Sequence, residues 1–192
     1  MSISDVGALL FHRSFYDLYL IADMTTLYLV RHGQTKDNVA KIMQGQRHGE
    51  LTFEGMMQIK VLSGTLAGVH FDALVTSDLQ RAFVSGAILS EELHLVPVTT
   101  TVLLRERDWG DFTGRYIPDL QDLPFPDNVE KMDDLLSRAR RFLQWIKSNY
   151  PDKVVLAVGH GIINKAIQAV HYKKLTREIP RMQNAEYRVL HL

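Results

Sequence analysis

The stretch TLYLVRHGQT, residues 26–35, joins an apolar run to an abrupt polar ending. Its first five residues, Thr26 to Val30, have the composition of a buried strand, and Arg31, His32 and Gly33 follow directly. In open α/β sheets, ligands bind beyond the carboxyl ends of the strands. The stretch therefore predicts a sheet strand that carries a cation and an imidazole into a site.

The rest of the chain alternates between strand-like and helix-like segments. Further strands are predicted at residues 71–76, 96–104 and 154–158, with a closing edge strand over 187–192. Helices are predicted at 52–66, with Thr52 as N-cap, and at 78–89, 129–147 and 162–170. This alternation predicts an α/β fold, a three-layer sandwich in which helices cover both faces of a mostly parallel mixed sheet.

The composition limits which kinds of protein and site are possible. The 192 residues are 46% hydrophobic and 23% charged, which fits one globular domain with an ordinary core. The formal net charge is zero, so the chain lacks the overall field of a nucleic-acid binder, and we expect no nucleic-acid partner. The absence of cysteine excludes disulfides, thiolate zinc sites and a thiol nucleophile.

Residues 1–23 differ in pattern from the rest of the chain and are predicted to be an N-terminal extension, either helical or unstructured. Arg13 and Asp17 interrupt its apolar patches, so no stretch is long enough to span a bilayer. It also lacks the pattern of a secretory signal, and we expect a cytoplasmic protein without a membrane partner. A helix that docks on a membrane or a protein is the alternative for this segment. Residues 24–192 are predicted to be the catalytic domain.

Polar residues also follow the other three predicted parallel strands. They are Ser77, Asp78 and Arg81 after the second, Arg105, Glu106 and Arg107 after the third, and Gly159, His160 and Gly161 after the fourth. Arginine offers a planar fork of donors that matches phosphate oxygens, and histidine can act as a nucleophile, a base or a donor. Glu106, flanked by two arginines, is the candidate general acid.

Each of these residues alone has an ordinary structural interpretation. Arg81 could be a solvated helix residue, Glu106 half of an ion pair with a neighbouring arginine, and Asn38 a helix cap. The functional prediction rests on their convergence at one edge of the sheet. The motifs of zinc proteases, P-loop nucleotide-binding proteins, dinucleotide-binding proteins and serine hydrolases do not occur in the sequence.

The residues after the first strand carry a known signature. Arg31-His32-Gly33-Gln34-Thr35 with Asn38 resembles the RHG(E/Q)T…N motif of the histidine phosphatase superfamily, the phosphoglycerate-mutase-like proteins. Four further blocks resemble that family in the same order: LTFEG at 51–55, TSDLQRA at 76–82, LRERDWG at 104–110 and VGHG at 158–161. The resemblance covers residues 24–192.

The resemblance implies a phosphomonoester hydrolase that needs no metal and no other cofactor. His32 would be the nucleophile and form a phosphohistidine, while Arg31, Arg81 and His160 would bind the phosphoryl oxygens. Glu106 would protonate the leaving oxygen and then activate water. The other implied phosphate- or substrate-binding residues are Gly33, Thr35, Asn38, Gln44, Gly45 and Gly161.

Departures from the family pattern indicate the kind of reaction. Phosphoglycerate mutases carry a long basic insertion after the glutamate block, whereas residues 116–127 here contain no lysine or arginine and three aspartates. These residues form a lid that is short and acidic. A short lid admits water to the phosphohistidine more readily, which favours hydrolysis over transfer to a second acceptor. The family's GES segment is replaced by PDNVE at 126–130, so its substrate contact is in question.

We therefore expect a phosphatase for a small phosphorylated metabolite, as a monomer or homodimer. A phosphoglycerate mutase and a phosphoprotein phosphatase are the alternative enzymes. A catalytically silent phosphate-binding module is a third class, and it is disfavoured because both histidines and the glutamate are present.

Overall fold

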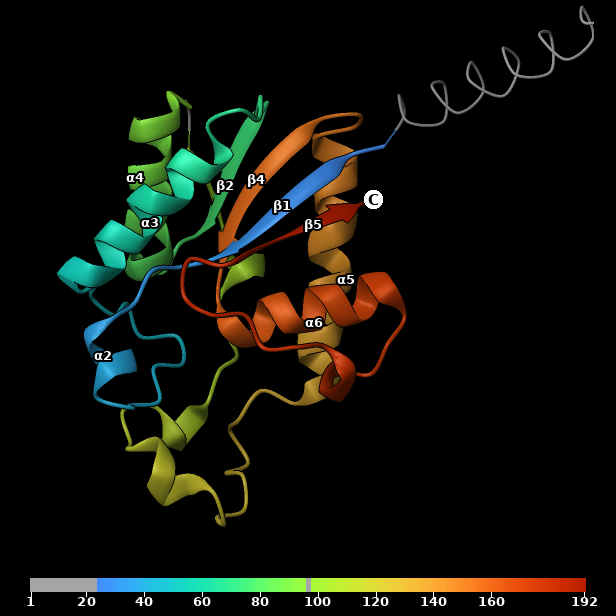
Figure 1. Ribbon diagram of the computed structural model, residues 1–192. Helices are drawn as coiled ribbons and strands as arrows, with labels where there is room; N and C mark the ends of the chain where they lie inside the picture. The colour runs from blue at the N-terminus through green and yellow to red at the C-terminus, as the bar shows by residue number, and fades with distance from the viewer. Residues whose placement is uncertain (1–23, 96–97) are drawn as a thin grey trace, which may run out of the picture.

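The computed structural model describes residues 24–95 and 98–192, and they form a central sheet with helices on either side (Figure 1). The strands are β1 (Thr26–Arg31), β2 (Ala73–Ser77), β3 (Val98–Thr101), β4 (Val154–Gly159) and β5 (Tyr187–His191). Their order in the sheet is β3-β2-β4-β1-β5. The first four in this order run parallel and β5 pairs antiparallel with β1, which confirms the mostly parallel mixed sheet.

Helices cover both faces of the sheet, as predicted. They are α2 (Lys36–Val39), α3 (Phe53–Leu66), α4 (Gln80–Leu93), α5 (Met132–Asn149) and α6 (Gly161–Tyr172). α3 and α4 lie on one side of the sheet, and α5 and α6 lie on the other (Figure 1). Each side has its own apolar core, one containing Ile59 and Leu89 and the other Phe142 and Ile167. Burial of both sheet faces explains why β1 and β4 are almost wholly apolar.

The register of β1 and β4 decides what meets at the edge of the sheet. Val30 lies opposite Val158, and Arg31 lies opposite Gly159. One residue further, the His32 amide donates to the Gly159 carbonyl at 3.1 Å, which brings His32 beside His160. Two histidines that are 128 positions apart in the sequence thus follow neighbouring strands at the same edge.

Element boundaries differ from the predictions where side chains bind the backbone. Thr52 is the N-cap of α3, as predicted, and accepts from the Gly55 amide at 2.9 Å. The third strand ends at Thr101 because its hydroxyl accepts from the Leu103 amide and starts a 3-10 turn, η1 (Val102–Leu104). The predicted start of that strand, residues 96 and 97, lies outside the described residues.

Two helices start later than predicted because the residues before them have other partners. Asp78 is bound by Arg105, so α4 begins at Gln80. Glu130 bonds to the loop at Asp108 through its amide and to Arg138 through its carboxylate, so α5 begins at Met132. Three further 3-10 turns are η2 (Gly110–Phe112), η3 (Ile117–Leu120) and η4 (Thr176–Glu178).

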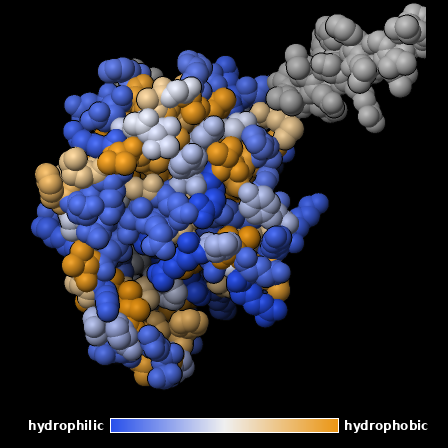
Figure 2. Space-filling view, in the orientation of Figure 1, coloured by the Kyte–Doolittle hydropathy of each residue, from blue (hydrophilic) through white to orange (hydrophobic). Residues whose placement is uncertain are grey.

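None of the helices within 24–95 and 98–192 has the length and apolarity needed to cross a membrane. On the face shown in Figure 2, hydrophobic side chains are interspersed with hydrophilic ones. The predicted N-terminal extension, residues 1–23, lies outside the described residues.

Candidate active site

A cavity of about 350 Å³ opens at the carboxyl edge of the sheet, where the parallel strands end. Most of the predicted site residues line it: Arg31, His32, Asn38, Gln44, Gly45, Arg81, Glu106 and Gly161. They come from the end of β1, from α2 and the loop after it, from the loop that follows β3 and η1, and from the starts of α4 and α6. The fold therefore brings together side chains that the sequence placed at four separate strand ends.

His32 is buried, and its ring has a fixed orientation. Its Nδ1 lies 2.7 Å from the Gly33 carbonyl oxygen. Since a carbonyl only accepts, Nδ1 carries the proton and Nε2 carries a lone pair. Burial, followed by the charges of Arg81 and Arg31, lowers the pKa of His32 well below 6.5. At neutral pH the ring is a neutral imidazole, which is the form that can attack phosphorus.

His160 is wholly buried and has the opposite tautomer. Arg81 Nε donates to its Nδ1 at 3.1 Å, and because arginine can only donate, the proton of a neutral His160 is on Nε2. Burial, Arg81 and His32 lower the pKa of His160 well below 6.5, so this ring is also neutral at pH 7. Nε2 has no hydrogen-bond partner among the described residues, and the two ring centroids are 5.1 Å apart. A lone pair and an N–H donor therefore lie side by side.

Arg81 is not a solvated helix residue; it is 1% exposed. Besides His160, its guanidinium donates to backbone carbonyls at Gly45 (2.8 Å), His48 (3.1 Å) and Arg47. Burial lowers its pKa to about 10, which leaves it charged at neutral pH. The loop that follows α2 thus holds one fixed positive charge against both histidines.

Arg31 is held by the loop that precedes β5. Its Nη1 donates to the Met182 carbonyl at 2.7 Å, and its buried Nε has no partner among the described residues. The Asn184 amide group donates to the His32 carbonyl at 3.0 Å, and the Ala185 amide donates to the Arg31 carbonyl at 3.0 Å. These contacts fix the end of β1. Arg31 lines the cavity, and its Nε–H is an unused donor there.

Glu106 lies at the N-terminus of α6. Its carboxylate accepts from the amides of Ile162 and Ile163 at 3.1 Å and from the Arg107 amide at 2.9 Å. Helix N-termini bind anions because their first amides have no partner within the helix. A Cβ at Gly161 would lie 3.7 Å from Glu106 Oε2 and 3.5 Å from Arg31 Nε, both ordinary van der Waals distances, so Gly161 is next to the carboxylate and the guanidinium alike. The ion-pair interpretation of Glu106 is wrong for Arg105, which binds Asp78 instead.

Three predicted residues do not line the cavity: Gly33, Thr35 and His160. Thr35 is buried and caps α2, accepting from the Asn38 amide at 3.0 Å, while Asn38 Oδ1 accepts from the Thr35 amide at 3.1 Å. The capping interpretation of Asn38 is therefore correct, although Asn38 also lines the cavity. Gly33 is close to α3, since a Cβ there would lie only 2.3 Å from the Gly55 carbonyl oxygen. Packing, rather than approach of an anion, accounts for this glycine.

Comparison with known protein families identifies the family that has this arrangement of residues. The model of the histidine phosphatase superfamily (branch 1) matches residues 27–192. The chain belongs to the histidine phosphatase superfamily. This confirms the resemblance inferred from the RHGQT, SDLQRA and GHG blocks.

Among relatives of this histidine phosphatase, the uncharacterized phosphatase PhoE of Bacillus subtilis is 34% identical over 142 residues, which cover 72% of each chain. The structure of a mycobacterial glucosyl-3-phosphoglycerate phosphatase complexed with VO3 superposes with a TM-score of 0.79 at 28% identity, covering 85% of this chain and 90% of that one. A bisphosphoglycerate-dependent phosphoglycerate mutase of Xanthobacter autotrophicus is 39% identical, but over only 46% of this chain and 44% of its own. These findings confirm the predicted fold and favour the phosphatase class over the mutase.

Several residues of the histidine phosphatase cavity were missed from the sequence. Lys165 and Arg181 line it, and so do the apolar residues Met43, Trp109 and Ile117. Lys165 is four positions after Gly161 and therefore on the same face of α6, which is a signal that could have identified it. Arg181 lies in the loop before β5 and has no such local signal.

The aspartates of the predicted lid, residues 116–127, lie away from the cavity of this histidine phosphatase. None of Asp119, Asp122 and Asp127 lines the cavity; residues 116–127 contribute Ile117. Within the described ranges, no group of three or more histidine, aspartate or glutamate side chains is arranged to hold a metal ion.

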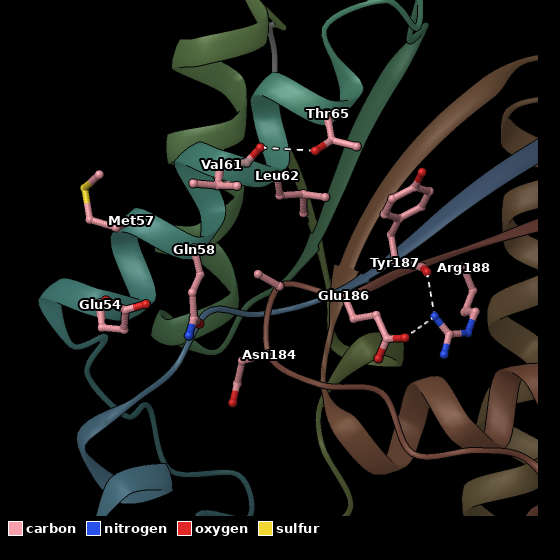
Figure 3. Close-up of a pocket in the computed structure, with 11 residues that line it drawn as sticks. Glu54, Met57, Gln58, Val61, Leu62, Thr65, Asn184, Glu186, Tyr187 and Arg188 are labelled. Atoms are coloured by element: carbon pink, nitrogen blue, oxygen red, sulfur yellow. Dashed lines mark hydrogen bonds and ion pairs between the residues drawn. The ribbon is translucent and has the colours of Figure 1, made fainter.

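A second hollow of about 650 Å³ lies between α3 and β5 and is shown in Figure 3. Met57, Val61 and Leu62 line its α3 side. Its one cation, Arg188, donates to the Tyr187 carbonyl at 2.9 Å and pairs with Glu186. Because it contains neither a histidine nor an unpaired cation, this larger hollow lacks the groups for phosphoryl chemistry.

Proposed function

We propose that this chain is a metal-independent phosphomonoesterase that transfers a phosphoryl group from a small phosphorylated metabolite to His32, and then to water. The observation that carries the proposal is the pair of opposite tautomers. His32 has its lone pair on Nε2, whereas His160 has an unpartnered N–H there. Buried polar atoms without partners are costly. Arg31 lines the cavity, and the ring of His160 lies 5.1 Å from that of the cavity-lining His32, so the unused donors Arg31 Nε and His160 Nε2 support a place for oxyanions beside His32.

In the first step, His32 Nε2 attacks phosphorus and the P–O bond to the leaving group breaks. Arg31, Arg81 and His160 donate to the phosphoryl oxygens and offset the charge that they carry in the transition state. Glu106, in its protonated form, gives its proton to the leaving oxygen, which departs as an alcohol. The amides at the start of α6 then stabilise the carboxylate that remains.

In the second step, water attacks the phosphorus of phospho-His32. Glu106 takes a proton from the water, the N–P bond breaks, and His32 regains its neutral form as inorganic phosphate leaves. The low pKa of His32 makes it a good leaving group and keeps its lone pair available for the next cycle. The positive groups supply the charge stabilisation for both steps.

Two observations support hydrolysis of a small molecule. Residues 116–127 contain no lysine or arginine that could hold a second phosphorylated acceptor, which favours water over transfer. A cavity of about 350 Å³ lies within the range of small-molecule sites and fits a metabolite-sized ligand. We also propose that residues 24–192 correspond to the catalytic domain, and the match of the family model to residues 27–192 supports this.

Hydrolysis of p-nitrophenyl phosphate in the presence of EDTA tests the proposal. We expect wild-type activity to persist with the chelator and the His32→Ala variant to be inactive. His70→Ala is the matched control, because His70 is exposed and lies just before β2, at the opposite edge of the sheet. Activity that the chelator abolishes, or that a folded His32→Ala variant retains, would contradict the mechanism.

A further inference from the structure

At β1 and β5 the sheet is covered less completely on its α3 side than on its α6 side. Paired residues of antiparallel strands face the same side, so Leu27 and Leu190 face the core of α5 and α6. Tyr28 and Val189, the next pair, face the α3 side. Leu27 and Leu190 are fully buried, whereas Tyr28 and Val189 are only half-buried. Val189 belongs to neither apolar core of the described residues, so this part of the sheet face is incompletely covered by them.

The neighbouring face of α3 is apolar and exposed as well. Phe53, Met57 and Val61 follow one another at intervals of four residues and therefore lie along one face of the helix. Phe53 and Val61 are 75% and 69% exposed. Met57, Val61 and Tyr187 line the hollow of about 650 Å³ between α3 and β5 (Figure 3). The Tyr187 ring stacks on that of Tyr28 at a centroid distance of 5.9 Å, so the hollow continues onto the half-buried sheet face. Contiguous apolar surface of this kind marks an interaction site.

The chain enters the described fold beside this surface. Thr26, the first residue of β1, pairs with His191, the last residue of β5, and Tyr187 is four residues back along the same strand. At about 3.4 Å per residue, this separation is about 14 Å. Residues 1–23 would measure about 35 Å even as an α-helix. The segment ahead of β1 is therefore long enough to reach the hollow and lie along it.

The sequence of residues 1–23 suits an apolar protein surface better than a membrane surface. It contains two apolar runs, ALLF at 8–11 and LYLIA at 18–22. Its only lysine or arginine is Arg13, whereas Asp5, Asp17 and Asp23 are acidic. Helices that lie on membranes are rich in lysine and arginine, because the cytoplasmic leaflet is anionic. An apolar hollow on the protein makes no such demand on charge.

We propose that residues 1–23 pack back on their own chain and cover the hollow between α3 and β5, with their apolar runs against Met57, Val61 and Tyr187. The occupant of this surface is thus a segment of the same molecule. The interaction goes beyond the proposed function and does not depend on it.

The hollow is connected to the proposed active site through the backbone. Gln58 and Glu186 are part of its wall. Gln58 Oε1 accepts from the Gln34 amide and the Glu186 carbonyl accepts from the Arg31 amide, both at 3.0 Å. Packing of residues 1–23 against this wall would therefore restrain the segment that carries His32.

Limited proteolysis with trypsin tests the packing in the full chain, because Arg13 is the one trypsin site within residues 1–23. Mass spectrometry follows the loss of residues 1–13, which we expect to be slow in the wild type. Met57→Asp and Val61→Asp each place a charge in the hollow and should accelerate this cleavage about tenfold or more, since cleavage follows the population of the open form. The control is Leu175→Asp, an exposed apolar position after α6 on the other side of the sheet, which should keep the wild-type rate.

Thermal unfolding shows whether each variant is folded, and the two substitutions in α3 replace exposed side chains, so both variants should fold. An unchanged cleavage rate at Arg13 in both folded variants would overturn the proposal. Protection that rises with protein concentration would assign the hollow to a second copy of the chain. Protection that appears only with phosphatidylglycerol vesicles would assign residues 1–23 to a membrane. Either of these two results would also overturn the proposal.

Discussion

Replacing Arg138 by methionine should destabilise the fold and impair catalysis through one buried ion pair. Arg138 Nε and Nη2 donate to the Glu130 carboxylate at 3.0 and 2.7 Å, and both side chains are almost buried, 10% and 14% exposed. The same guanidinium donates to the carbonyls of Leu103 and Glu106 at 3.1 and 3.3 Å. It therefore ties α5 to the backbone of the proposed acid.

Loss of one partner leaves the Glu130 charge buried, which costs about 3–5 kcal/mol. Since the described domain is of ordinary size, each kcal/mol lowers the Tm by about 2–4 °C, and we expect a decrease of about 6–20 °C. Removing both charges in Arg138→Met/Glu130→Gln should recover much of this loss, because no uncompensated charge remains. We also expect kcat/KM for p-nitrophenyl phosphate to fall more than tenfold in the single variant, because the Glu106 carbonyl loses a donor.

Denaturant unfolding of the wild type, both single variants and the double variant forms a thermodynamic cycle. A loss of less than 1 kcal/mol for Arg138→Met, or additive losses in the double variant, would refute the argument that the pair is buried and coupled.

Three further results are expected from the geometry. Burial and two arginines lower the pKa of His32 well below 6.5, so protonation removes its lone pair only at lower pH. As the pH falls through 6.5, kcat/KM should therefore show no loss that comes from His32. An NMR titration of His32 with a midpoint at 6.5 or above would contradict this. Gly33→Ala should lower the Tm and the activity because its Cβ would meet the Gly55 carbonyl, whereas Gly64→Ala, with open space around it, should stabilise α3 by about 0.5–1 kcal/mol; equal thermal shifts would count against the packing argument. Arg81→Lys should lower kcat/KM about a hundredfold or more, since a single ammonium cannot bond to His160 and three carbonyls at once; near wild-type kinetics would show that the fork is dispensable.

The ends of β1 and β4 were predictable because their short, almost wholly apolar runs indicate buried parallel strands. β1 and β4 carry apolar residues on both faces of the sheet up to Val30 and Val158, and the polar residues after them had to emerge at its carboxyl edge. The sequence left the roles of Arg81 and Glu106 open between a surface and a site position. Burial and contacts with distant segments decided between them: Arg81 bonds to Gly45, and Glu106 bonds to Ile162. Local sequence contains neither kind of information.

Other features depend on long-range contacts that no periodicity encodes. Arg181 reaches the cavity only because the loop before β5 folds back to hold the end of β1. Arg138 has the sequence context of an exposed cation on an amphipathic helix, yet it is buried because Glu130 and backbone carbonyls neutralise it. The short third strand reflects a side-chain cap at Thr101, a competition between local bonds that composition does not resolve.

The phosphoryl adduct tests the central claim most directly. Mixing the enzyme with p-nitrophenyl phosphate, quenching within the first turnovers at alkaline pH and measuring intact mass and peptide masses would locate it. We expect one phosphoryl group on His32, labile to acid, present in His70→Ala and absent in His32→Ala. An adduct on another residue, or rapid turnover with no adduct under the same quench, would contradict the account.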